Sequence, residues 1–151
     1  MSIPSAGILT YRMRKRSLEV FLIHPGGPFW RNKDEGAWSI PKGKIESGED
    51  PLDAARREFT EETGFEVDGD FTLLGTFRQP GGKDVTAFAV EGECDPEKLV
   101  SNMFSVMWPP KSGKFADFPE VDRGGWFTRA EAETKVLKGQ KQILDALEKH
   151  A

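Results

Sequence analysis

The segment 50–64 constrains the fold most, because it carries a complete set of signals for one helix. Asp50 is a good N-cap residue, and Pro51 suits the first helical position. Gly64 suits the position just beyond the C-terminal end, where a left-handed backbone is common. The apolar residues of the segment fall within one narrow arc of a helical wheel: Leu52, Ala55 and Phe59. The segment therefore predicts a helix that packs an apolar stripe against the rest of the chain.

Three carboxylates adjoin this stripe. Glu58 precedes Glu61 by three residues and Glu62 by four, so all three are neighbours on the helix surface. An acidic helix face is often only solvated. Here, however, the acids lie beside the stripe, and Arg57 is the sole base among residues 57–62. Because Mg²⁺ and Mn²⁺ prefer carboxylate oxygens, the pattern indicates a site for a hard divalent cation.

A polar loop, residues 41–49, precedes the helix and contains two glycines, two lysines and two glutamates. Gly43 allows the backbone to approach a ligand closely, and its carbonyl is a candidate metal ligand. Lys42 and Lys44 are candidates for contact with phosphate oxygens. Alone, the loop is better interpreted as an ordinary polar turn, but next to the acidic helix it indicates a phosphate site.

Composition places the chain among globular proteins. Its 151 residues suit a single domain, residues 1–151, with a full core. The net charge of −4 argues against general nucleic-acid binding, which needs a basic field. Seven acids and four bases lie between Lys42 and Glu62, so most of the surplus negative charge belongs to this loop and helix. The single cysteine excludes an intrachain disulfide and a cysteine-based zinc cluster.

Targeting signals are not evident in the sequence. No apolar run approaches the length that spans a membrane. The first apolar stretch is not preceded by the basic residues of a signal peptide. We therefore expect a cytoplasmic protein without a membrane partner, and both a monomer and a homodimer remain open.

Strand and helix patterns alternate along the chain. Strands are predicted at residues 6–13, 18–24, 71–78, 84–91 and 125–127. Further helices are predicted after Thr128, which forms a capping box with Glu131, and at residues 140–150. Residues 101–119 are aromatic and interrupted by prolines, so they are predicted to be irregular. The alternation and the hairpin around Gly81 favour an α/β fold with a mixed sheet and helices packed on it.

The loop and the helix together match every fixed position of the Nudix box. The match runs over Gly43–Phe65, with Glu49, the Arg57-Glu58 pair and the Glu61-Glu62 pair at the required spacings. The chain therefore resembles the Nudix hydrolase family. The resemblance implies an α/β/α sandwich with a mixed central β-sheet. It also implies hydrolysis of a nucleoside diphosphate linked to another moiety, with Mg²⁺ or Mn²⁺ as cofactor.

The resemblance also implies roles for individual residues. The metal ligands would be Glu58, Glu61, Glu62 and the carbonyl of Gly43. Arg57 would orient the glutamates by a salt bridge, with Glu49 as its partner. The general base varies within the family, so Glu58 and the downstream Glu120 are both candidates.

The substrate is expected to be a small-molecule nucleotide. Trp38-Ser39-Ile40-Pro41-Lys42-Gly43 is similar to the W-x-x-P-K-G pattern of dinucleoside polyphosphate hydrolases, which makes this the leading subgroup. The tyrosine that this subgroup carries beyond the box is missing here, where the sequence reads Gly81-Gly82-Lys83. ADP-ribose, a nucleoside triphosphate and an RNA 5′ end remain alternative substrates, and a non-catalytic ligand sensor is the alternative from another class.

Candidate substrate-binding residues lie on both sides of the box. The candidates for contact with the substrate are Trp38, Lys42, Lys44, Arg78 and Lys83. Packing of Trp38 at a strand end would be compatible with this role. The aromatic segment 101–119 is a candidate lid, because long irregular loops in compact domains are often functional. Its aromatic side chains would stack on a base or pack in the core: Phe104, Trp108, Phe115 and Phe118.

Overall fold

The computed structural model of the chain describes residues 3–150. Its main sheet contains β1 (Ile3–Arg14), β2 (Ser17–Pro25), β3 (Lys42–Lys44), β4 (Thr72–Gln79), β5 (Lys83–Glu91) and β8 (Val121–Thr128). The strand order is β4-β5-β1-β2-β8, and β3 pairs with β1. β1 and β5 run parallel, whereas the other pairs are antiparallel. The sheet is mixed, as predicted.

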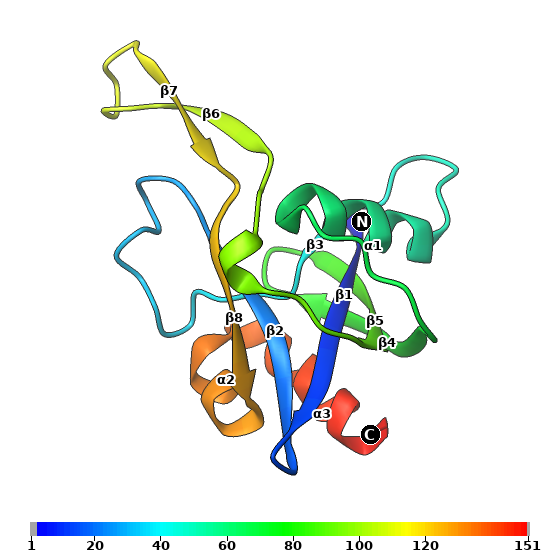
Figure 1. Cartoon of the computed structure of the whole chain (residues 1–151). Helices are drawn as coiled ribbons and strands as arrows, with labels where there is room; N and C mark the ends of the chain where they lie inside the picture. The colour runs from blue at the N-terminus through cyan, green and yellow to red at the C-terminus, as the bar shows by residue number, and fades with distance from the viewer. Residues whose placement is uncertain (1–2, 151) are drawn as a thin grey trace.

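Helices cover both faces of the sheet. α1 (Pro51–Thr63) lies on one face, and α2 (Arg129–Lys135) and α3 (Lys141–His150) lie on the other (Figure 1). Successive side chains of β2 point to opposite faces of the sheet and so pack in two hydrophobic cores. Phe21 packs with α1 in one core, and Leu22 packs with α2 and α3 in the other. The fold is therefore the predicted α/β/α sandwich. Among residues 3–150, no helix has the length and apolar character needed to cross a bilayer.

The predicted caps of α1 are confirmed. The Asp50 side chain accepts a hydrogen bond from the Leu52 N–H at 3.0 Å. Gly64 has φ +78°, and its N–H donates to the Thr60 carbonyl at 2.8 Å. The apolar stripe differs from the prediction, because Leu52 is only half-buried and Ala54 joins Ala55 and Phe59 in the core. These contacts fix the rotation of α1 and hence the direction of its carboxylates.

The prediction of an irregular segment at residues 101–119 is wrong. The segment forms an antiparallel hairpin of β6 (Met103–Met107) and β7 (Phe115–Pro119), which projects from the body of the molecule (Figure 1). Exposed residues alternate with half-buried ones along β6, so no strongly apolar face reveals the strand pattern. Pro109 and Pro110 lie in the connection between the two strands, where a ladder hydrogen bond is not needed, and Pro119 is the last residue of β7.

The remaining elements are short or shifted at their ends. β3 was not predicted, because its three residues, Lys42–Lys44, are polar and flank a glycine. The capping box of Thr128 and Glu131 is confirmed. Two 3₁₀ turns, Pro96–Lys98 and Lys138–Gln140, complete the chain, so Gln140 precedes α3 rather than beginning it.

Candidate active site

At the centre of the site, β3 and α1 are in close contact. A Cβ atom on Gly43 would lie 2.0 Å from the carboxyl carbon of Glu58 and 2.2 and 2.4 Å from its two oxygens. A side chain at this position would therefore displace the carboxylate of Glu58. The contact brings the backbone of β3 against the carboxylate of Glu58 on α1. A polar loop joins the two elements.

Arg57 binds several acidic groups around this contact. Its Nε and Nη2 donate to the two carboxylate oxygens of Glu49 at 2.9 and 3.0 Å. Its Nη1 donates to Glu58 at 2.9 Å and lies 3.4 Å from Glu61. Its Nη2 also donates to the carbonyl of Lys44 at 3.0 Å. The ion pair expected between Arg57 and Glu49 is thus present, and the guanidinium holds the loop and the helix in one arrangement.

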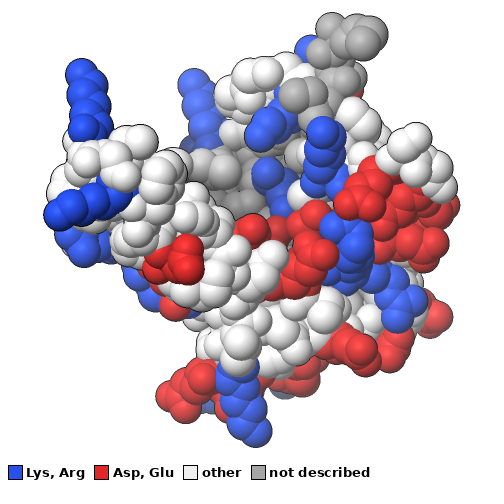
Figure 2. Space-filling view, turned by 90° about the horizontal axis from the view of Figure 1, so that it is seen from above, with Lys and Arg blue, Asp and Glu red and all other residues white. Residues whose placement is uncertain are grey.

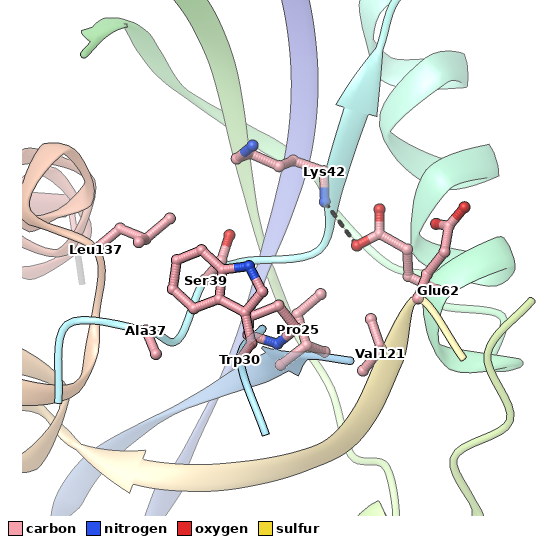
Figure 3. Close-up of a pocket in the computed structure, with 10 residues that line it drawn as sticks. Pro25, Trp30, Ala37, Ser39, Lys42, Glu62, Val121 and Leu137 are labelled. Carbon is pink, nitrogen blue, oxygen red and sulfur yellow. Dashed lines mark hydrogen bonds between the residues drawn. The ribbon is translucent and has the colours of Figure 1, made fainter. Parts of the chain in front are cut away.

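Glu62 is the most buried of the three box glutamates, with 7% of its surface exposed. Burial, together with the nearby Glu58, raises the pKa of Glu62 to about 9. The backbone N–H of Lys42 lies 3.4 Å from its Oε1 (Figure 3). Burial, followed by Glu58 and Glu61, also raises the pKa of Glu120. Several carboxyl groups therefore share one region in which negative charge is poorly compensated.

The donor groups of this region fit a hard divalent cation. They are carboxylate oxygens and a backbone carbonyl, which Mg²⁺ and Mn²⁺ prefer. Within residues 3–150, no three His, Cys, Asp or Glu side chains converge on one preformed metal position. Arg57 accounts for this in part, because it draws Glu58 and Glu61 toward itself. Mg²⁺ is commonly held by only one or two carboxylates together with water, so the donor set still suits it.

A cavity of about 280 Å³ opens beside these acids. Figure 3 shows Glu62 and Lys42 on one side of it, Leu137 and Ala37 on the other, and the indole of Trp30 between them. Glu120 also lines the cavity. Burial lowers the pKa of Lys42, whereas the nearby Glu62 opposes this shift. The cavity thus combines acidic groups, one half-buried lysine and an aromatic ring.

Trp38 is buried and does not line the cavity. It is 5% exposed and packs edge-to-face against Phe127 at 4.9 Å. Its indole N–H donates to Asp34 at 2.8 Å. The packing expected for Trp38 at a strand end is therefore present, and its role in substrate binding stays a prediction. The aromatic side chain that lines the cavity is Trp30, which the sequence analysis missed; its only signal was an aromatic pair just after the Pro25–Pro28 turn.

The other basic candidates lie at different distances from the cavity. Lys83 is exposed at the start of β5, close enough for its charge to lower the pKa of Lys42. Arg78 is 69% exposed and pairs with Asp84 at 2.8 Å. Lys44 is exposed and contributes its carbonyl to Arg57. Figure 2 shows basic side chains around a hollow on the face seen from above, with acidic side chains gathered along one side of it.

The comparison with known families agrees with this architecture. The model of the NUDIX domain family matches residues 1–147, and the chain belongs to that family. Among curated relatives, an RNA pyrophosphohydrolase of Bartonella clarridgeiae is 59% identical, over 70% of this chain and 65% of that protein. An uncharacterised 17.7 kDa protein of Enterobacteria phage T4 is 41% identical, over 48% of this chain and 55% of that protein. The chain thus spans between half and two thirds of the length of these two relatives.

Solved structures share the fold. The NUDIX domain of Shewanella oneidensis NrtR, complexed with ADP ribose, matches with a TM-score of 0.67 and 15% identity, over 99% of this chain and 88% of that one. A Caenorhabditis elegans Ap4A hydrolase matches with a TM-score of 0.64 and 21% identity, over 98% and 96% of the two chains. At these identities the match establishes the architecture, and the predicted Nudix fold is confirmed.

Proposed function

We propose that the protein is a divalent-metal-dependent pyrophosphohydrolase that cleaves the polyphosphate chain of a nucleotide. The observation that carries the proposal is the contact of Gly43 with Glu58 beside the buried Glu62, at a cavity that Lys42 also lines. Family membership supports the same reaction class. An arrangement that leaves carboxylates crowded and poorly compensated costs stability, which is common where a site serves catalysis.

The proposed reaction needs residues that bind the metal, bind the phosphate and accept a proton. Glu58, Glu61, Glu62 and the carbonyl of Gly43 would hold Mg²⁺ or Mn²⁺. The bound ion supplies neutralisation of charge on the phosphate oxygens and a lower pKa for bound water. Lys42 would bind a phosphate oxygen, and Arg57, held by Glu49, positions Glu58 and Glu61. Glu58 and Glu120 are the two candidates for accepting the proton of the attacking water.

Two substrate classes have specific support. A 5′-triphosphorylated RNA end is favoured by the curated relative named RNA pyrophosphohydrolase. A dinucleoside polyphosphate is favoured by the W-x-x-P-K-G pattern and by the similar Ap4A hydrolase structure. We give first place to the RNA end, because that relative is far more similar in sequence. Recognition of a single end does not require the basic field of a general nucleic-acid binder. A cytoplasmic location and a monomeric or homodimeric state remain predictions.

The proposal is tested by a hydrolysis screen with the full chain and Mg²⁺. The substrates are 5′-triphosphorylated RNA, diadenosine tetraphosphate, ADP-ribose and nucleoside triphosphates, and the products are identified by mass. Glu62→Gln is expected to lower kcat by about 10² or more, since it removes a carboxylate oxygen from the metal donors. Glu66→Gln, an exposed neighbour outside the cavity, serves as the matched control. Absence of Mg²⁺-dependent turnover on every substrate would favour the non-catalytic sensor instead.

A further inference from the structure

A second cavity, of about 400 Å³, adjoins the first and has mainly aromatic and apolar walls. The residues that line it are Pro25, Gly26, Phe29, Trp30, Phe104 and Glu120. Pro25, Trp30 and Glu120 line both cavities. A ligand with its phosphates near Lys42 would therefore extend past Trp30 into the second cavity.

The walls come from two segments that pack directly on each other. The Gly26 N–H donates to the Glu120 carbonyl at 2.8 Å. A Cβ atom on Gly27, where φ is +95°, would lie 2.8 Å from the ring of Phe104. Phe29 meets Trp108 edge-to-face at 5.5 Å. The loop after β2 and the β6–β7 hairpin thus form one unit, with the cavity between them.

A buried histidine fixes the loop that carries Trp30. His24 is fully buried, and its Nδ1 lies 2.8 Å from the Asp122 carboxylate on β8. Its Nε2 lies 2.5 Å from the carbonyl oxygen of Lys33. The Lys33 N–H in turn donates to the Trp30 carbonyl at 2.9 Å. These hydrogen bonds therefore connect the backbone of Trp30 to the buried His24, while the ring of Trp30 lines the cavity.

The aromatic residues at this cavity are unusually exposed. Phe29 is 55% exposed and Trp30 is 37% exposed. Exposed apolar groups gathered at a concave site commonly mark ligand binding. A nucleobase suits such walls, because every base presents a π face that stacks on aromatic side chains. The phosphate end of the same molecule suits the neighbouring lysine and acids.

We propose that the second cavity binds the nucleobase of the substrate, by stacking on Trp30 and Phe104, and that the β6–β7 hairpin thereby selects among substrates. The inference rests on the proposed function, because the base is placed by its linkage to a phosphate chain in the first cavity. It assigns a role to a hairpin that contributes little to either core of the sandwich.

Binding of metal-free mononucleotides to the full chain tests the inference apart from turnover. Calorimetry in EDTA is performed with GMP, AMP and ribose 5-phosphate. The wild type is expected to bind GMP or AMP more tightly than ribose 5-phosphate. Trp30→Ala is expected to weaken mononucleotide binding about fivefold to 100-fold, the range for loss of one base–aromatic stack, and Trp30→Phe is expected to retain most of it. In turnover, the loss in Trp30→Ala is expected in KM rather than kcat.

Phe115→Ala is the matched control, because Phe115 lies on the same hairpin, is 67% exposed and does not line the cavity. Phe104→Leu provides a second variant, which removes the aromatic face and keeps an apolar side chain beside Gly27. Wild-type affinity for mononucleotides in both Trp30→Ala and Phe104→Leu would overturn the inference, as would equal affinity of the wild type for ribose 5-phosphate. Base-dependent binding without any hydrolysis would instead overturn only the proposed reaction.

Discussion

Glu58 and Glu62 stand on one helix, whereas Trp30 and Phe104 come from segments 74 residues apart that meet only in the folded chain. The acid cluster is held by a network of charged hydrogen bonds around Arg57. The aromatic cavity is held by ring contacts and by one buried histidine. The two regions share a wall at Glu120. Under the proposed function, the reaction would therefore depend on residues that are close in sequence, while substrate choice would depend on a separate hairpin.

The largest effect is expected from filling the space between β3 and α1. Gly43→Ala would place a Cβ 2.0 Å from the carboxyl carbon of Glu58, so the carboxylate must leave its position. We expect kcat to fall by about 10² or more, since displacement of a catalytic group by about 1 Å has effects of this size. The measurement is steady-state hydrolysis with the substrate found in the screen.

Gly92→Ala is the control for this change. A Cβ on Gly92 would make only ordinary contacts, at 3.5 and 3.6 Å. We expect wild-type kcat and a similar unfolding midpoint. Retention of full activity in Gly43→Ala would contradict the placement of Glu58 in the reaction.

A smaller loss of kcat is expected when the guanidinium of Arg57 is replaced by a single ammonium group. Arg57→Lys keeps the charge but cannot hold both oxygens of Glu49 and also reach Glu58 and Glu61. We expect kcat to fall about tenfold to 100-fold, together with a rise in the Mg²⁺ concentration that gives half-maximal rate. Glu49→Gln is expected to act through the same network, so the double variant should lose less than the sum of the two.

Arg56→Lys provides the comparison, because Arg56 pairs with the exposed Asp68 and not with the acid cluster. Its kcat and Mg²⁺ dependence are expected to match those of the wild type. Additive effects of Arg57→Lys and Glu49→Gln would show that the two residues act separately, against the positioning role given to Arg57.

Substitutions at the tip of the β6–β7 hairpin test the region of the aromatic cavity. Lys111 and Lys114 are exposed there and do not line either cavity. The double change to alanine is expected to raise KM by about two- to fivefold at low salt, because exposed charges contribute weakly, and to leave kcat unchanged. An effect on kcat comparable to that of Arg57→Lys would remove the distinction between the two regions.

The smallest effect on activity is expected at Cys94. Its thiol is half-buried and lines neither of the two cavities, and burial raises its pKa to about 12. Because the thiolate is the reactive form, alkylation by iodoacetamide at pH 8 should be slower by about 10² or more than that of a free thiol. Mass spectrometry of the time course provides the measurement, and Cys94→Ala should keep wild-type turnover. Rapid modification with loss of activity would contradict the placement of Cys94 outside the site.

The acid cluster could be predicted from sequence because it is local. Helix caps, the i, i+3 and i, i+4 spacings and the glycine at position 43 are all properties of neighbouring residues. Trp38 shows the limit, since the spacing of a motif does not reveal which way a side chain points. The sequence does not reveal that Trp30 and Phe104 line one cavity, because this depends on long-range packing of the loop on the hairpin. The β6–β7 strands escaped prediction because they lack a buried face.

Mn²⁺ binding to the folded chain tests the central claim most directly. Calorimetry at neutral pH compares the wild type with Glu58→Gln/Glu62→Gln and with Trp30→Ala. The account predicts that the double variant binds Mn²⁺ at least about tenfold more weakly, while Trp30→Ala binds it as the wild type does. The double variant should remain folded, because glutamine keeps the length of glutamate and a neutral amide removes the repulsion between these crowded carboxyl groups. Unchanged Mn²⁺ affinity in the folded double variant would contradict the assignment of α1 as the metal-binding element.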